Sequence, residues 1–322
     1  MQDLKILQQQ IERELDQLQV SHSPDSLYEP IRYFLSIGGK RIRPILVLLA
    51  TRLFGNKRED VINQALAVEL FHNFTLVHDD IMDNAPLRRG IQTIHEKWNP
   101  SQAILSGDVL MIVAYQYLMR THAQYYEALM TSFNKMAIEV CEGQQMDMDF
   151  ENRSDVSIPE YIEMIRLKTS VLLGCALEIG AIISDASEAD KKNIYDFGVN
   201  IGLAFQIQDD ILDVYADADK FGKQVGGDII SNKKTWLYLT ARRQANETQQ
   251  AVFEAQMNND RHPEKVQIIR DLYDDLQVRQ SAEAEMRGYY EQAMEHLKSI
   301  SVDTADKREL IVLADYLMGR EV

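Results

Sequence analysis

The sequence predicts an all-α fold, and three observations support this. Glycine and proline number only 15 and 7 among 322 residues, and both residue types interrupt helices. No proline occurs between Pro159 and Pro263. Apolar residues recur every three or four positions, which is the period of an amphipathic helix. Since no stretch has the composition of a flexible linker, we expect a single helical domain over residues 1–322.

The expected helices of the first third are short except for the last. Leu4, Leu7, Ile11, Leu15 and Leu18 predict an amphipathic first helix. Residues 21–30 read as a break, after which a short helix runs to Gly38-Gly39 and another begins at Pro44. The segment 60–82 reads as one long helix, and 86–90 as a polar loop.

The rest of the chain repeats the same pattern with longer helices. We expect helices over 101–120, 124–149, 158–184 and 189–214. The segment 216–232 contains three glycines and reads as a functional loop. Residues 233–322 alternate helical pattern with polar breaks such as 258–263.

Composition excludes several classes of protein. The formal net charge of −16 argues against nucleic-acid binding, which needs a basic surface. Two cysteines cannot form a disulfide framework or a four-thiolate zinc site, and their apolar neighbours predict that Cys141 and Cys175 are buried. The N-terminus lacks the pattern of a signal peptide, and every apolar run is too short for a transmembrane segment. We therefore expect a cytoplasmic protein.

Two acidic motifs share the pattern D-D-I-x-D at the C-terminal ends of apolar helices. They are Asp79, Asp80 and Asp83, and Asp209, Asp210 and Asp213. On a helix the first and last aspartates of each motif project together, while the middle one is rotated by about 100°. A single motif could be a solvated acidic helix end. Two copies instead predict an oxygen-only site for several hard cations, Mg²⁺ before Zn²⁺.

Basic residues accompany both acidic motifs, although the chain is strongly acidic. Gly38-Gly39-Lys40-Arg41-Ile42-Arg43 places three cations beside two glycines, and Arg88-Arg89 follow the first motif. Lys168, Lys223 and Lys233 are isolated candidates that could also be surface lysines. Cations beside metal-binding carboxylates suit a diphosphate ligand. The chain has no P-loop, no G-x-G-x-x-G after a strand, no H-E-x-x-H and no recognisable catalytic triad.

From about Tyr28 to Tyr316 the chain resembles the trans-isoprenyl diphosphate synthases of the polyprenyl synthetase family. The matching segments are 38–44, His72, 76–83, 88–90, 107–108, 143–147, 168–169, 205–213, 222–223 and 232–233. The resemblance implies a helical bundle around a deep central cavity, an isoprenoid synthase-like fold, and a homodimer. It further implies condensation of isopentenyl diphosphate with an allylic diphosphate (dimethylallyl, geranyl or farnesyl diphosphate).

The resemblance also implies a role for each candidate residue. Asp79, Asp83 and Asp209 would be the main ligands of about three Mg²⁺ ions, with Asp80, Asp210 and Asp213 completing the motifs. Arg88, Lys168 and Lys223 resemble contacts to the allylic diphosphate. Lys40, Arg43, His72 and Arg89 resemble the isopentenyl diphosphate pocket, with Lys233 at its rim. Lys168, Thr169 and Gln206 would stabilise an allylic carbocation through their dipoles.

Product length would depend on the depth of the cavity along the helix of the first motif. Phe74 lies five residues before Asp79, about 7.5 Å deeper, and Phe71 is the next turn down. Phe74 could equally be a core residue. In the family a large aromatic residue here marks short-chain enzymes, whereas Thr75 is small where some farnesyl enzymes place a second aromatic. The first motif also lacks the two-residue insertion of typical bacterial farnesyl enzymes. The resemblance favours a twenty-carbon product, with fifteen carbons as the alternative.

Two other functions are compatible with parts of the pattern. A class I terpene cyclase would share the first motif, but its second metal motif would read Asn/Asp-Ser/Thr-Glu rather than Asp209-Asp210-Ile-Leu-Asp213. A non-catalytic subunit of a hetero-oligomeric synthase would commonly lack one aspartate motif, and this chain has both. A generic acidic helical interaction protein would leave the paired motifs unexplained.

Overall fold

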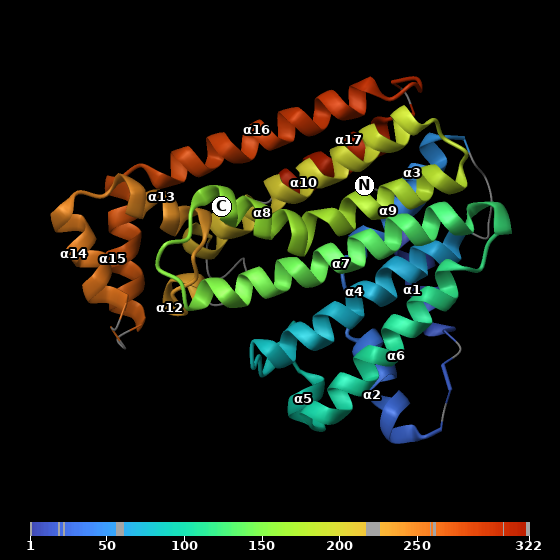
Figure 1. The fold of residues 1–322 in the computed structure, drawn as a ribbon, viewed down its shortest axis with the longest axis horizontal. Helices are drawn as coiled ribbons and strands as arrows, with labels where there is room; N and C mark the ends of the chain where they lie inside the picture. The colour runs from blue at the N-terminus through green and yellow to red at the C-terminus, as the bar shows by residue number, and fades with distance from the viewer. Residues whose placement is uncertain are drawn as a thin grey trace. The chain divides into compact units, whose positions relative to one another are not determined.

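The computed structural model describes residues 2–18, 20–21, 23–55, 61–216, 226–257, 259, 262–304 and 306–319. These residues are mostly helical, with a single two-stranded hairpin among them (Figure 1). The all-α prediction is therefore confirmed. By their contacts the residues form two compact units, which are described separately below. That the whole chain acts as one domain stays a prediction.

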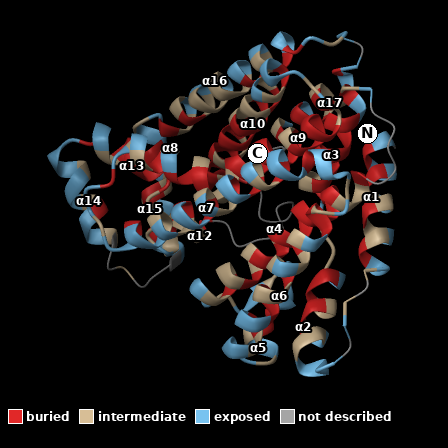
Figure 2. Ribbon diagram, turned by 45° about the vertical axis from the view of Figure 1, so that its right-hand side comes forward, coloured by how far each residue is buried: buried red, intermediate tan, exposed pale blue. Residues whose placement is uncertain are grey.

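Unit 1 consists of Met1–Phe133, Ala176–Lys191 and Val302–Leu310. Its most extensive helix packing is that of α4 against α6, and α3 also lies along α4. Figure 2 shows α3 as a largely buried helix, in keeping with its nearly continuous apolar sequence. Its elements are α1(Gln2–Asp16), α2(Asp25–Ser36), α3(Ile42–Leu53), α4(Ile62–Met82), β1(Leu87–Arg88), β2(Ile91–Gln92), α5(Ile94–Lys97), α6(Pro100–Leu118) and η2(Ala123–Tyr125).

Unit 2 consists of Asn134–Cys175, Lys192–Ser301 and Ile311–Val322. Residues of α7, α9, α10 and α17 are divided between the two units. The remaining elements of the chain are α7(Tyr126–Glu151), α8(Ile158–Ile165), the π-helical turn η3(Arg166–Ser170), α9(Val171–Ile183), α10(Glu188–Tyr215), α12(Gly227–Ile230), α13(Trp236–Gln244), α14(Glu247–Met257), α15(His262–Asp275), α16(Val278–Ser299) and α17(Arg308–Met318).

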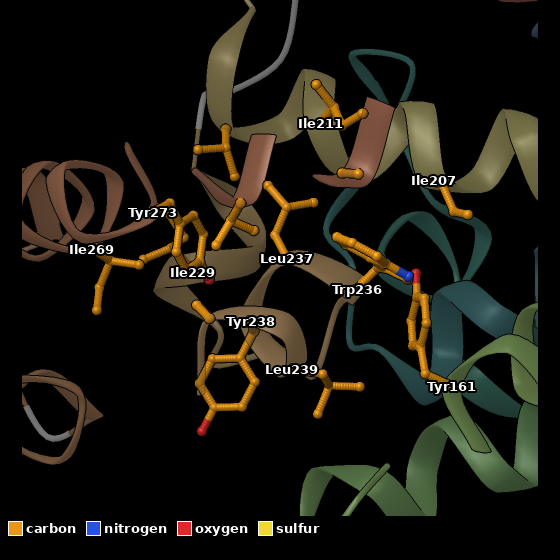
Figure 3. Close-up of a cluster of buried hydrophobic side chains, with 14 of the residues drawn as sticks. Tyr161, Ile207, Ile211, Ile229, Trp236, Leu237, Tyr238, Leu239, Ile269 and Tyr273 are labelled. Atoms are coloured by element: carbon orange, nitrogen blue, oxygen red, sulfur yellow. The ribbon is translucent and has the colours of Figure 1, made fainter. Parts of the chain in front are cut away.

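A buried apolar cluster organises unit 2. Residues of α13, among them Trp236 and Leu237, pack with Ile207 and Ile211 of α10 (Figure 3). Tyr161 of α8 lies beside Trp236 in the same view. This packing fixes the turn of α10 that carries the second aspartate motif.

The predicted break over 21–30 is wrong in its second half. Helix α2 begins at Asp25 and contains Pro30 in its interior, where the side chain is buried. Proline cannot donate to the carbonyl four residues earlier. The carbonyl of Ser26 instead accepts a hydrogen bond from Gln102 Nε2 at 3.1 Å. A residue of α6 thus replaces the bond that the proline removes, and tertiary contact overrides the local signal.

One of the two cysteine predictions is also wrong. Cys175 is buried, as expected, but Cys141 is exposed. The exposed face of α7 includes Ile138, Cys141, Gln145 and Met148, spaced three or four residues apart. The apolar neighbours of Cys141 in sequence therefore point elsewhere, because consecutive helical residues do not share a face.

Within the part of the chain that the structure describes, no single helix is both long and apolar enough to cross a bilayer. One bent pair, Pro100–Leu118 with Ala123–Glu151, reaches that threshold on length and composition alone.

Candidate functional site

The first aspartate motif ends α4, and the hairpin after it supplies a cation. Asp80 is buried, whereas Asp79 is half-buried and Asp83 exposed, as the helical rotation of the middle residue predicts. Arg88 Nε donates to Asp80 Oδ1 at 2.7 Å. Its Nη2 lies 2.6 Å from Asp80 Oδ1 and 3.2 Å from Asp79 Oδ2. One guanidinium therefore bridges the first two carboxylates.

This bridge and the burial around it oppose each other electrostatically. Burial raises the pKa of Asp80 and outweighs the hydrogen bond and charge of Arg88, which lower it. For Arg88, burial lowers the pKa, but the hydrogen bond to Asp80 and the three nearby carboxylates raise it above its usual value. The arginine stays charged and offsets part of the motif's negative charge.

A second part of unit 1 is a basic cluster of Arg43, His72 and Arg89, which we call the basic pocket; Arg43 and His72 are half-buried and Arg89 is exposed. Arg43 Nη1 lies 3.1 Å from His72 Nε2. Burial, followed by the charges of Arg43 and Arg89, lowers the pKa of His72 well below its usual value. Burial also lowers the pKa of Arg43 to about 10. At pH 7 the arginine is thus charged and the imidazole neutral.

The contact between the two side chains fixes the tautomer of His72. A guanidinium only donates, so Nε2 must accept and Nδ1 must carry the proton. The Nε–H of Arg43 is buried and makes no hydrogen bond with any residue that the structure describes. The pocket therefore offers donors to an anion.

The glycine pair of the 38–44 segment allows a close approach by Arg89. A Cβ atom on Gly39 would lie 2.6 Å from Arg89 Nη1, and burial lowers the pKa of this arginine. Gly38 has φ +76°, which favours glycine. Arg43, His72 and Arg89 thus come together, as the sequence predicts. Lys40 is solvent-exposed.

Phe74 and its neighbours form an aromatic row in unit 1. The ring of Phe74 lies 5.5 Å from that of Phe71 and 4.8 Å from that of His78. Both phenylalanines are buried. Thr75 is turned toward its own helix, since its hydroxyl donates to the His72 carbonyl at 2.8 Å. This geometry suits a cavity floor and a packed core equally well.

Unit 2 contains a polar cavity of about 240 Å³ below the end of α10. Many of the candidate residues of this unit line it. The lining is Asp147, Tyr161, Met164, Ile165, Lys168, Thr169, Gln206, Asp209, Asp210, Asp213, Asp228, Lys233, Lys234 and Thr235.

The second aspartate motif again has a buried middle residue. Asp210 Oδ2 accepts from the hydroxyl of Tyr161 at 2.6 Å and from the backbone N–H of Trp236 at 3.0 Å. Burial and the charge of Asp228 raise the pKa of Asp210 well above its usual value. Asp213 Oδ2 accepts from the backbone N–H of Asp228 at 3.0 Å. Asp209 and Asp213 remain half-buried on the cavity wall.

The π-helical turn presents Lys168 and Thr169 to the cavity. Lys168 Nζ pairs with Asp147 Oδ2 at 2.5 Å, and the Thr169 hydroxyl donates to Gln206 Oε1 at 3.3 Å. A side chain at Gly143 would overlap the backbone nitrogen of Lys168. The glycine thus lets α7 pack directly on this turn, and π-helical turns often occur at functional sites.

The remaining lysine candidates have different outcomes. Lys233 is exposed, and its Nζ lies 3.9 Å from Asp228 Oδ1. Gly222 and Lys223 lie outside the described residues, so the prediction for Lys223 stays a prediction.

Sequence reasoning assigned no role to four residues whose contacts the structure shows. They are Glu69, Asp147, Tyr161 and Asp228. The only signals available were an acid on the apolar face of α4 for Glu69 and an acid after a glycine pair for Asp228. Tyr161 offered none, because its partner Asp210 lies 49 residues away.

The carboxylates of each motif fit a Mg²⁺ site to which substrate phosphates would add ligands. The atoms that they offer to a metal are all oxygens. Oδ2 of Asp80 is buried and accepts no hydrogen bond from any residue that the structure describes. Among the described residues, no three His, Cys, Asp or Glu side chains are already arranged around one point. Mg²⁺ is usually held by one or two carboxylates together with substrate phosphates, which agrees with both observations.

Comparison with known proteins gives a consistent result. The polyprenyl synthetase family model matches residues 24–276. The geranylgeranyl pyrophosphate synthase of Geoglobus acetivorans is 36% identical over 318 residues, which cover 97% of this chain and 96% of the relative. The geranylfarnesyl diphosphate synthase of Natronomonas pharaonis is 41% identical over 240 residues, or 69% of this chain and 70% of the relative.

Solved structures of prenyl diphosphate synthases are also similar to this chain. The crystal structure of a geranylgeranyl pyrophosphate synthase matches with a TM-score of 0.93 at 41% identity, covering 99% of both chains. The geranylgeranyl pyrophosphate synthetase from Pyrococcus horikoshii gives 0.93 at 34% identity, covering 99% of this chain and 98% of that one.

Proposed function

The chain belongs to the polyprenyl synthetase family and is a prenyltransferase, and from that premise we propose its substrates, product and site residues. It condenses isopentenyl diphosphate with an allylic diphosphate to give a short-chain trans-prenyl diphosphate. One observation carries the proposal. The chain has two chemically different kinds of candidate anion site, namely the oxygen-only aspartate motifs and the basic pocket, in which a guanidinium lies beside a neutral imidazole. Condensation of two diphosphate esters releases one diphosphate and retains the other, and two kinds of anion site suit these two fates.

Asp79, Asp83 and Asp209 would be the main ligands of about three Mg²⁺ ions. These ions would neutralise charge on the departing diphosphate. Asp80, Asp210 and Asp213 complete the two motifs. Arg88 holds Asp79 and Asp80 in place and, with Lys168 and Lys223, contacts the same anion. Asp228 orients Asp213 through its backbone N–H.

The basic pocket binds isopentenyl diphosphate through donors that need no metal. Arg43, Arg89 and Nδ1–H of His72 supply these donors, and Lys40 and Lys233 assist from exposed positions. Because no metal is needed, this substrate should bind in the presence of a chelator.

Carbon–carbon bond formation requires a cation that no side chain attacks. The allylic C–O bond breaks, the double bond of isopentenyl diphosphate attacks, and a proton is lost to the released diphosphate. The Thr169 hydroxyl donates a hydrogen bond to Gln206, so the lone pairs of its oxygen remain available to a positive centre. The backbone dipole of Lys168 can stabilise the same positive centre.

The product we propose has twenty carbons, with fifteen as the alternative. Phe74 is buried, and its ring lies against those of Phe71 and His78, so it can close a cavity along α4. Substitution Phe74→Ala should lengthen the product. Phe197→Ala removes a buried ring of α10 and should leave the product unchanged. A Phe74→Ala enzyme with the wild-type product distribution would mean that another residue forms the floor.

The partner we propose is a second copy of the chain. Helix α6, whose other side is buried, carries three apolar residues that are each more than two-fifths exposed, Ile104, Leu105 and Ile112. A helix that is apolar on both sides is usually covered on both. Sedimentation should show a dimer that Ile112→Glu dissociates, while Ile6→Lys on the exposed side of α1 leaves it intact.

The cytoplasm is the compartment we propose, and cell fractionation would test it. In keeping with a reducing compartment, both cysteines are free thiols.

The decisive experiment incubates the purified chain with Mg²⁺, labelled isopentenyl diphosphate and each allylic primer in turn. We expect a prenyl diphosphate product, read by chromatography, that is abolished by a chelator. Absence of elongation with every primer would refute the proposal, as would undiminished turnover in chelator. Release of a cyclic hydrocarbon instead would indicate a terpene cyclase.

A further inference from the structure

A buried ion pair lies beside the basic pocket of unit 1. Arg41 precedes α3 and has φ +52°, a left-handed conformation. Its Nη1 lies 2.5 Å from Glu69 Oε1 of α4, and its Nη2 donates to the Leu35 carbonyl at 3.2 Å. The two side chains are only 3% and 5% exposed. The sequence grouped Arg41 with the anion-binding cations, but the structure turns it toward a carboxylate.

The carboxylate of Glu69 is itself held from the following turn of its helix. Asn73 Nδ2 donates to Glu69 Oε1 at 3.2 Å and to the Glu69 carbonyl at 2.6 Å. His72, the partner of Arg43, lies between these two residues in the sequence. The ion pair and the basic pocket are therefore built on one turn of α4 and the start of α3.

Glu69 interacts with more than one arginine. Its charge acts on Arg43, where it opposes the lowering of the pKa by burial, and on Arg89. The charge of Glu69 is thus felt by all three arginines, although only Arg41 is in direct contact with it. Arg41 takes that carboxylate by direct contact, and Arg43 is left in contact with the neutral His72.

We propose that Arg41 is a positioning residue, which occupies Glu69 so that Arg43 stays on His72 and faces the isopentenyl diphosphate. Without Arg41, the buried carboxylate would lack its main partner and would draw Arg43 out of the pocket, because an unpaired buried charge is strongly unfavourable. The proposal rests on the assignment of this pocket to isopentenyl diphosphate.

Three variants separate this role from a merely structural one. Arg41→Met removes the pairing charge, and methionine tolerates the left-handed backbone no worse than arginine, since neither is β-branched. Arg41→Met/Glu69→Gln also removes the carboxylate that would capture Arg43. Arg52→Met is the control, because it breaks an exposed ion pair of the same helix, that with Glu309.

The readout is the binding of isopentenyl diphosphate by titration calorimetry in the presence of a chelator, together with the KM of each substrate. We expect Arg41→Met to weaken isopentenyl diphosphate binding by about tenfold, the effect of losing one hydrogen bond to a charged group. The KM of the allylic substrate should not change. The double variant should recover wild-type affinity within about threefold, and Arg52→Met should match wild type.

Several results would overturn the proposal. One is unchanged binding by Arg41→Met. Another is a double variant that binds isopentenyl diphosphate as weakly as the single variant, which would indicate that Arg41 has a structural role only. If Arg41→Met does not fold, as checked by circular dichroism, the double variant must still fold and bind, and its failure counts against the proposal. If the wild-type chain elongates primers and Arg41→Met binds isopentenyl diphosphate as tightly as wild type, this inference alone is refuted. A wild-type chain that neither binds nor elongates would refute the proposed function as well.

Discussion

The two aspartate motifs share the pattern D-D-I-x-D, but their middle aspartates meet different partners. Asp80 is bound by the guanidinium of Arg88. Within the described residues, Asp210 accepts from the neutral Tyr161 hydroxyl and from the backbone N–H of Trp236. The middle aspartate of the first motif therefore has a compensating charge, whereas that of the second is held by dipoles.

This difference predicts unequal roles for the middle residues and equal roles for the outer ones. Asp79 and Asp209 are half-buried in each case, so each can reach a metal ion. Asp80 holds a cation that itself contacts Asp79, while Asp210 mainly joins α10 to α8 and α13. Four predictions, taken from the largest expected effect to the smallest, test this comparison.

The largest effect should come from the outer aspartates. Asp79→Ala and Asp209→Ala should each lower kcat/KM by about 10²–10³-fold, because each removes charge stabilisation at the reacting diphosphate. Steady-state elongation assays at saturating Mg²⁺ measure both. Wild-type activity in either variant would remove that motif from the reaction.

A smaller effect should follow from Asp80→Asn. The amide keeps the shape of the side chain but leaves Arg88 with a weaker partner, so Asp79 loses part of its positioning. We expect kcat/KM to fall by about tenfold or somewhat more. The same assay with Arg88→Met should give a loss of at least this size, and a harmless Arg88→Met would contradict the bridging role.

Asp210→Asn should matter less than Asp80→Asn. Both hydrogen bonds reach one oxygen, Oδ2, and an asparagine carbonyl in that place accepts them equally. Asp210 is buried and forms no ion pair with a residue that the structure describes, so loss of its charge should cost little. We expect kcat/KM within about threefold of wild type. A loss greater than that of Asp80→Asn would reverse the comparison.

The smallest effect on rate should come from Tyr161→Phe. It removes a hydroxyl that is bound to Asp210, so kcat should stay within about twofold while the free energy of unfolding falls by about 1–3 kcal/mol. Urea unfolding and the elongation assay measure the two quantities. An unchanged stability together with a large loss of rate would assign Tyr161 to the chemistry.

Local periodicity was enough to predict most helices and both aspartate motifs. The end of α4, for example, follows from its apolar face, and the rotation of Asp80 and Asp210 away from their neighbours follows from helix geometry. The same reasoning wrongly predicted a break at Pro30, because Gln102 of another helix donates a hydrogen bond to the carbonyl that proline leaves without a partner.

Within the site, sequence reasoning could name residue types but not their pairings. Arg41 and Arg43 are two positions apart, yet one binds a carboxylate and the other a neutral imidazole. Likewise Tyr161 and Asp210 are brought together only by the folding of unit 2. Partners distant in sequence decide which charges remain available to substrate, and one sequence alone does not reveal them.

The most direct test of the central claim is a double-variant cycle with Asp79→Asn and Asp209→Asn, measured as kcat/KM for elongation. If both motifs act on one departing diphosphate, the double variant should lose little more than the worse single variant, since residues that act as a unit are not additive. Losses that multiply would show that the two motifs act independently, and would contradict the account.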